Sequence, residues 1–309
     1  MMTALQDLKN FDPANAQVNL WTVKGPSGQA AQSPTYSGHW VETTPGVDQA
    51  LKEAFAADSA RIEEVLDYSL LAQNNEASAL HIQADETHSG TLIAEIAAEV
   101  ASKKARTVKH LQNSKFYVAK FIAGDQIVYG VRKTDTGWRT KKAASVRNLY
   151  FADEQLALDE RPHFELSRTF DFFILGDDIL ILDKGHFETV LRHKAEQRED
   201  FAALRAEPEF LAVFVSIDPL VAYIGDNKIQ LRRACAIHSK GHYRDPIFME
   251  QLRNNQAEYG FTIEFDDQGR IVATPETCAQ IMKALLDHRL KSGFSSLIYD
   301  VQDTTPVNV

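Results

Sequence analysis

The chain has 309 residues, of which 44% are hydrophobic and 25% charged, a composition typical of a folded globular protein. No apolar stretch reaches the roughly 18–20 residues that a membrane-spanning helix needs. Residues 1–11 lack the basic start and apolar core of a secretory signal. Two cysteines are too few for a disulfide framework or a cysteine-rich zinc site, so Cys235 and Cys278 are expected to be reduced, buried thiols. We therefore expect a cytoplasmic protein.

The N-terminal third predicts a mixture of strands and helices. Alternation of apolar and polar residues favours strands, and apolar residues spaced by three or four favour helices. The expected elements are a strand over 18–23, a loop over 25–38, a helix over 47–57, strands over 62–70 and 78–83, and a helix from Ser89 into the Lys103–Arg106 cluster.

The middle of the chain predicts β-hairpins, and the C-terminal part predicts mainly helices. Two β-rich runs over 116–132 meet at Gly124-Asp125, and two over 170–182 meet at Gly176-Asp177. Helices are expected within 187–206, after Asp245-Pro246 and over 274–290, with a third hairpin over 261–273 and a last strand over 295–301. This order predicts an α+β fold, in which antiparallel hairpins form a central sheet flanked by helices and the C-terminal part is rich in helix.

Basic residues are concentrated in one segment, although the whole chain carries a net charge of −10. Residues 101–150 contain twelve basic and two acidic residues, a net charge of +10, whereas the other 259 residues carry −20. Residues 228–244 form a second basic stretch without a carboxylate. Such asymmetry indicates an anionic partner, even though solvated surfaces are the usual place for charged runs.

Motifs for common enzyme classes are missing from the sequence. It has no phosphate-binding loop, no dinucleotide fingerprint and no nucleophile elbow. His238 and His242 are four residues apart, but two histidines do not make a zinc site. We therefore expect no enzyme, with no catalytic residues, no metal, no cofactor and no small-molecule substrate. One alternative stays open, a metal-dependent nuclease that uses Asp177, Asp178, Asp183 and Lys184.

Several segments of the C-terminal two thirds resemble one known family. They are Leu231-Arg232-Arg233 to Tyr243, the run from Phe261 to Ile271, Leu286 to Ser292, Ile298 to Val301, and the hairpin over 173–182. Together with the chain length, these segments resemble the KwaB subunit of the bacterial Kiwa anti-phage defence system. The resemblance divides the chain into an N-terminal α/β region, residues 1–110, and a KwaB-like α+β domain, residues 111–305. Within that domain, the change from hairpins to helices predicts an internal boundary near residues 183–187.

The resemblance implies a function. KwaB-like proteins bind DNA and act with a small membrane protein, KwaA, to restrict phage DNA replication and late gene expression. A chain of this kind would be recruited to the inner face of the membrane by that partner, and the charge asymmetry is also compatible with a homodimer. No recognition helix is evident, so we expect DNA binding that is largely independent of sequence.

The residues expected to contact DNA come from charge clustering alone. They are Lys103, Lys104, Arg106, Lys109, Lys133, Arg139, Lys141, Lys142, Arg147, Arg232, Arg233 and Lys240. A second alternative is that the same basic segment docks on an acidic protein or an anionic lipid.

Overall fold

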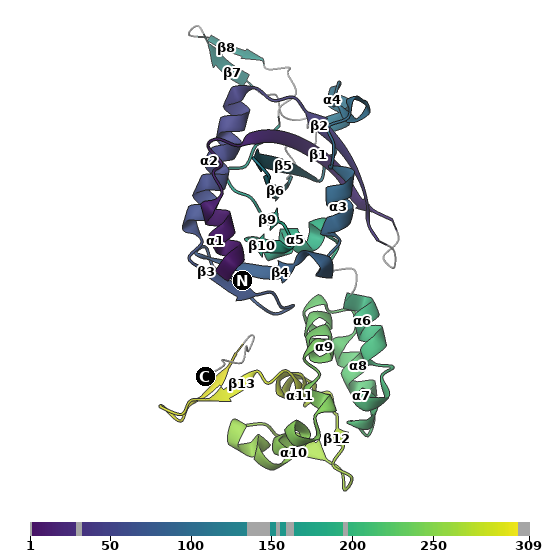
Figure 1. Ribbon diagram of the computed structural model, residues 1–309. Helices are drawn as coiled ribbons and strands as arrows, with labels where there is room; N and C mark the ends of the chain where they lie inside the picture. Colours follow the sequence, from purple (N-terminus) through teal and green to yellow (C-terminus); the bar gives the residue numbers. More distant parts are fainter. Residues whose placement is uncertain are drawn as a thin grey trace. The chain divides into compact units, whose positions relative to one another are not determined.

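The computed structural model describes residues 2–28, 33–134, 149–152, 155–158, 164–193 and 197–301. The chain divides into two compact units (Figure 1). Unit 1 comprises Met1–Asp67 and Gln73–Lys194, and unit 2 comprises Tyr68–Ala72 and Ala195–Val309. The predicted α+β class is confirmed, because helices surround an eight-stranded mixed sheet. The predicted domain limits, 1–110 and 111–305, stay predictions.

Unit 1 is built on the eight-stranded sheet, whose strand order is β2-β1-β5-β6-β9-β10-β4-β3. Every neighbouring pair is antiparallel except β3 and β4, which are parallel. The strands of this sheet are β1 (Gln17–Ser27), β2 (Thr35–Val41), β3 (Glu64–Asp67), β4 (Ser78–Gln83), β5 (Phe116–Ala123), β6 (Gln126–Lys133), β9 (Phe172–Leu175) and β10 (Asp178–Ile181). A separate pair is formed by β7 (Leu149–Ala152) and β8 (Gln155–Leu158).

Helices pack on both faces of this sheet, which explains why β9, near its centre, is apolar and buried throughout. Successive residues of a strand point to opposite faces. Phe173 packs against Phe55 of α2, with ring centroids 5.0 Å apart, and Phe172 packs against Phe187 of α5 at 5.4 Å. The helices of unit 1 are α1 (Met2–Asn10), α2 (Pro45–Arg61), α3 (Ser89–Glu95), α4 (Val108–Leu111) and α5 (Lys184–Val190), with short 3-10 helices at Ala84–Glu86 (η1) and Ala101–Lys103 (η2).

Unit 2 is mainly helical, as the sequence predicted for the C-terminal part. Its core includes Ile281, Met282 and Leu285, the apolar stripe of α11, and the side chains of Leu70 and Leu71 pack against that core. Its helices are α6 (Gln197–Leu204), α7 (Pro208–Ala212), α8 (Asp218–Ile224), α9 (Lys228–Lys240), α10 (Pro246–Asn255) and α11 (Cys278–Leu285), with η4 (His242–Arg244) and η5 (Gln256–Tyr259). Its short strands are β11 (Glu264–Phe265), β12 (Ile271–Val272), β13 (Arg289–Lys291) and β14 (Ile298–Asp300).

Two expectations about the bulk properties of the chain can be compared with the structure. Cys235 and Cys278 are free, buried thiols, as predicted. Within the described residues, no helix is both long and apolar enough to cross a membrane.

Candidate functional site

One end of the large sheet brings lysines from three adjacent strands together. Val23 of β1 pairs with Phe116 of β5, which in turn pairs with Lys133 of β6. Lys115 lies one residue before Phe116, and its N–H donates to the carbonyl of Val23 at 2.8 Å. Lys24 follows Val23 directly. The pairing register therefore places Lys24, Lys115 and Lys133 at the same end of the sheet.

The short helix α4 adds further basic residues at this end. The Nζ atom of Lys24 donates to the backbone carbonyl of Lys109 at 3.1 Å, which docks α4 against β1. His110 of α4 stacks on His39 of the edge strand β2, with ring centroids 4.6 Å apart. The backbone N–H of Arg106 donates to Nδ1 of His110 at 3.0 Å. We call Lys24, Arg106, Lys109, Lys115 and Lys133 the cationic sheet end.

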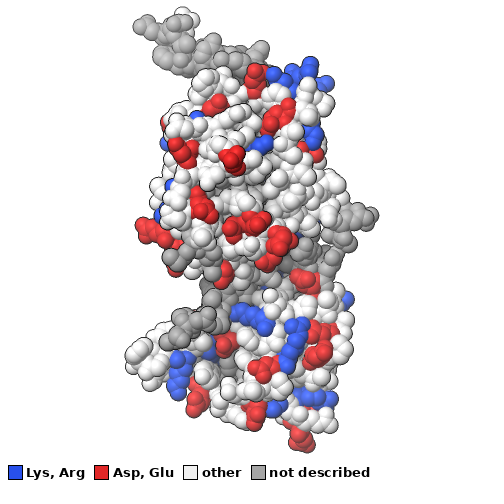
Figure 2. All heavy atoms as spheres, in the orientation of Figure 1, with Lys and Arg blue, Asp and Glu red and all other residues white. Residues whose placement is uncertain are grey.

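Two neighbouring lysines already have partners. Lys103 forms an ion pair with Glu95 at 3.0 Å, and Lys104 forms one with Glu42 at 2.5 Å and lies over the ring of Trp40. In contrast, no described carboxylate lies within ion-pair distance of Arg106, Lys109, Lys115 or Lys133. Figure 2 shows lysine and arginine atoms gathered over the region of α4. An anion can therefore bind to this surface without first breaking ion pairs between these four side chains and described carboxylates.

Partial burial distinguishes His39 from the lysines around it. Burial, followed by the neighbouring His110 and Lys24, lowers the pKa of His39. Its Nδ1 atom is buried and has no hydrogen-bond partner within the described part of the chain. The exposed basic side chains of this surface are Arg106, Lys109 and Lys115, whereas Lys24 and Lys133 are half-buried.

The predicted DNA-contacting residues fall into three groups. Lys103, Lys104, Arg106, Lys109 and Lys133 belong to unit 1 and lie at or beside the cationic sheet end. The predicted residues Arg139, Lys141, Lys142 and Arg147 lie outside the described residues, and they follow Thr134, whose N–H is bonded to Lys115 at that same end.

The third group, Arg232, Arg233 and Lys240, belongs to α9 of unit 2. These side chains are half-buried. Arg233 is 3.4 Å from the side-chain oxygen of Gln230, and Lys240 is 3.4 Å from the carbonyl of Leu286. Half-buried side chains with contacts inside their own unit are less available to a polyanion than the exposed cations of unit 1.

Sequence reasoning missed Lys24 and Lys115 as members of the surface. Lys24 is more than 75 residues away from the basic segment in the sequence, and only the antiparallel pairing of β1 with β5 brings it there. Lys115 directly precedes a predicted strand, so its place at the end of the sheet could have been inferred from the strand boundary.

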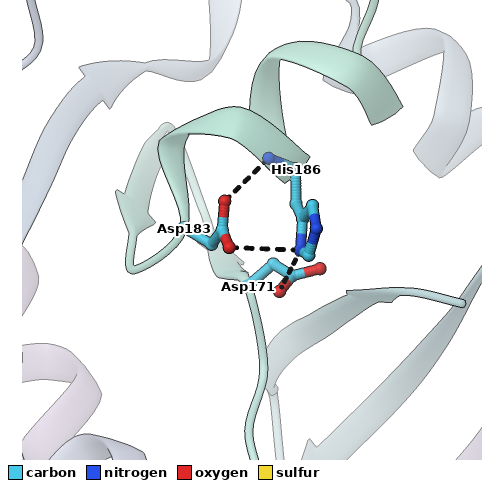
Figure 3. A group of neighbouring side chains, drawn as sticks. All are labelled: Asp171, Asp183 and His186. Carbon is cyan, nitrogen blue, oxygen red and sulfur yellow. Dashed lines mark hydrogen bonds and ion pairs between the residues drawn. The ribbon is translucent and has the colours of Figure 1, made fainter. Parts of the chain in front are cut away.

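A second polar cluster lies beneath the same end of the sheet (Figure 3). The carboxylate of Asp171 is completely buried. Its Oδ1 atom accepts from Arg132 at 2.7 Å and lies 2.9 Å from Nδ1 of His186, and its Oδ2 atom accepts the N–H of Lys133 at 2.6 Å. Asp183 caps α5 by accepting the N–H of His186 at 2.8 Å, and its other oxygen lies 3.2 Å from Nδ1 of that residue.

The donor types of this cluster resemble those of a metal centre. Ligand atoms of Asp171, Asp183 and His186 lie within 4.8 Å of one another, and carboxylate with imidazole suits a divalent transition metal. However, the guanidinium of Arg132 and a backbone N–H already satisfy Asp171, so a metal ion would have to displace a buried ion pair. The residues therefore fit a metal poorly. Instead, the contacts of Asp171 connect the end of β6 with the start of α5, and its hydrogen bond to the N–H of Lys133 fixes the backbone position of that residue.

The carboxylates considered for a nuclease do not gather in one place. Asp178, at the start of β10, pairs with His81 at 2.6 Å and accepts from Gln83. Asp183 lies beyond the other end of the same strand, and five residues of extended chain span roughly 16 Å. His238 and His242, the pair considered for zinc, also have different neighbours: His238 lies 3.4 Å from Glu207, and His242 stacks on Phe248.

The architecture defines an α+β chain of two units, one of which carries an unpaired cationic surface at the end of its sheet. Comparison with family models assigns this chain to a family. The chain belongs to the KwaB-like family, since the model described as Kiwa protein KwaB-like matches residues 111–294, more than half of its length. This match confirms the resemblance read from the sequence and indicates a component of a Kiwa anti-phage defence system. Neither a curated protein nor a solved structure matches the chain.

Proposed function

We propose that this chain is the DNA-binding subunit of a Kiwa defence system. The cationic sheet end, with the basic segment 135–148 that follows it, holds phage DNA by its phosphates and largely without sequence preference. The chain performs no chemistry of its own. It acts with a membrane partner of the KwaA type to block phage DNA replication and late transcription.

One observation carries this proposal. Arg106, Lys109, Lys115 and Lys133 share a surface of unit 1 on which no described carboxylate neutralises them. Lysine and arginine contacts to phosphate supply most of the affinity of proteins that bind DNA without sequence preference. The acidic remainder of the chain favours a local contact through this surface over general adhesion to nucleic acid.

Binding of the full-length chain to a labelled DNA duplex, measured over a range of salt concentrations, tests the proposal. We expect affinity to fall steeply as salt rises. The double variant Arg106→Glu/Lys109→Glu should lose about ten-fold or more in affinity and should show a shallower salt dependence, by about one unit of slope for each lost phosphate contact. Lys141→Glu/Lys142→Glu tests the adjoining segment in the same way.

The matched control is Lys9→Glu/Lys52→Glu, which reverses the same number of charges on α1 and α2. If this control loses as much affinity as the first variant, the effect is general and the assignment to the sheet end is wrong. Running the samples with magnesium on a gel also reports cleavage. Cut DNA would favour the metal-dependent nuclease, and Asp178→Ala or Asp183→Ala should then abolish cutting. No binding at any salt would favour a protein or lipid partner.

A further inference from the structure

The C-terminal hairpin of unit 2 exposes an unusual number of apolar side chains. Leu290, Leu297, Ile298 and Tyr299 are each 43–59% exposed, and Phe294 is fully exposed. Residues 292–299 contain no charged side chain. Large apolar groups clustered on an exposed projection generally mark a surface that another molecule covers.

These side chains surround the hairpin and do not form one flat face. Leu290 pairs with Tyr299, and Lys291 pairs with Ile298. Adjacent pairs point to opposite sides of a two-stranded ribbon. The first pair therefore exposes apolar groups on one side, Ile298 exposes one on the other, and Phe294 and Leu297 occupy the turn. A flat protein partner would cover only one side, whereas a lipid layer surrounds the whole end of the hairpin.

The backbone of the turn is largely satisfied within the hairpin. The N–H of Ser292 donates to the carbonyl of Leu297 at 2.9 Å, and that of Ser296 donates to the carbonyl of Ser292 at 3.0 Å. The Oγ atom of Ser292 accepts from Phe294 and Ser295, and the Oγ atom of Ser295 accepts from Leu297. Backbone groups that enter a lipid phase must find such internal partners, because water is scarce there.

The base of the hairpin is fixed and basic. Asp300 accepts from Lys283 at 2.5 Å and from Arg289 at 2.9 Å, and Arg289 also lies over the ring of Phe261. Lys291 stands between this base and the uncharged tip, with Glu258 3.7 Å away. An exposed ion pair of that length is worth little. In Figure 1 the hairpin extends away from the helices of unit 2, and Figure 2 shows lysine and arginine atoms directly behind its uncharged end.

We propose that the β13–β14 hairpin inserts its uncharged tip into the interfacial layer of an anionic phospholipid bilayer. Phe294, Leu297 and Ile298 enter the boundary between headgroups and acyl chains, Tyr299 lies at headgroup level, and Lys291 contacts the anionic headgroups. Aromatic and aliphatic groups with flanking cations are the usual composition of such peripheral contacts. This contact is direct, belongs to unit 2, and does not depend on the DNA-binding function.

Co-sedimentation of the full-length chain with vesicles tests the proposal. One vesicle contains phosphatidylcholine alone, and the other contains phosphatidylcholine with about one third phosphatidylglycerol. We expect binding to the anionic vesicle and weaker binding to the neutral one. The variant Phe294→Ser/Leu297→Ser should weaken binding to the anionic vesicle about ten-fold or more. Lys291→Gln should weaken binding only to that vesicle, by about five-fold.

The matched control is Ile229→Ser/Ile247→Ser, which removes two other exposed apolar side chains of unit 2, 63% and 66% exposed, outside the hairpin. This control should bind vesicles as the unaltered chain does. The proposal is overturned if the unaltered chain binds neither vesicle, or if the tip and control variants bind equally well. It is also overturned if the tip variant alters the mass of the chain in sedimentation equilibrium without vesicles, since the hairpin would then contact a second copy. Unchanged circular dichroism and an unchanged thermal unfolding midpoint in the tip variant exclude misfolding.

Discussion

Replacing Asp171 by alanine should destabilise unit 1 strongly. The carboxylate is completely buried and accepts hydrogen bonds from Arg132 and the N–H of Lys133, with His186 at 2.9 Å. Its removal leaves a partly buried guanidinium and a backbone N–H without their acceptor. Breaking one side of a buried ion pair typically costs about 3–5 kcal/mol, a large part of the stability of an average domain.

Urea unfolding followed by tryptophan fluorescence measures the free energy of unfolding of unit 1. All three tryptophans of the chain lie at positions 21, 40 and 138, so the signal comes from unit 1 alone. The matched variant is Asp183→Ala, which removes a 43% exposed carboxylate of the same cluster and mainly costs the cap of α5, about 1 kcal/mol.

The free energies of unfolding of the two variants, measured with and without manganese, show whether the cluster is a structural ion-pair network or a metal site. If Asp171→Ala unfolds within about 1 kcal/mol of the unaltered chain, the energetic reasoning about the buried pair is wrong. If added manganese stabilises the unaltered chain and both variants lose that effect, the cluster holds a metal after all.

Three other predictions concern single residues. Gly130→Ala should destabilise unit 1 by about 1–3 kcal/mol in the same urea assay, because the added Cβ would lie 2.8 Å from the buried ring of Phe170. The hydrogen bond from Arg244 lowers the pKa of Glu207 from 4.5 to about 2, so the stability that Glu207 contributes is fully present above about pH 4.5 and is lost as the pH falls toward 2. Glu207→Gln should therefore flatten the acid dependence of unfolding, followed by circular dichroism. Asn227→Ala should cost about 1 kcal/mol in that assay, because its side chain caps α9.

The hairpins were predictable because their signals are local. Gly124 and Gly176 both adopt positive φ angles at the turns, a conformation that glycine enters without strain, and apolar strands flank each turn. The predicted runs over 116–132 and 170–182 are the strand pairs β5–β6 and β9–β10. The order of the strands depends on contacts between distant segments, and no local pattern specifies it.

The helix predicted from Ser89 to the lysine cluster was wrong in its length. The apolar stripe continues, but α3 ends at Glu95. Beyond that point the chain turns so that the carbonyl of Ala97 and the carboxylate of Glu99 both contact the buried amine of Lys120, at 3.0 Å and 3.3 Å. Satisfying a buried lysine outweighs helix propensity here.

The candidate site was predictable only in part, for the same reason. Charge counting found the basic segment, including Arg106, Lys109 and Lys133. It did not find Lys24, which joins the surface through strand pairing. It also missed Asp171, which stands among phenylalanines and carries no motif of its own, although this residue fixes the end of β6.

The path of the chain between the two units constrains how the protein is made. Residues 68–72 leave unit 1, and their Leu70 and Leu71 pack against the apolar core of unit 2, whose remaining residues follow Lys194. During synthesis, all residues of unit 1 emerge from the ribosome before residues 195–309 are made, so Leu70 and Leu71 have no core to pack against until unit 2 is complete. A fragment that begins at residue 195 would lack them permanently. Dividing the chain at one position cannot produce two complete units. Expressing unit 2 alone would require residues 68–72 to be fused to the fragment 195–309.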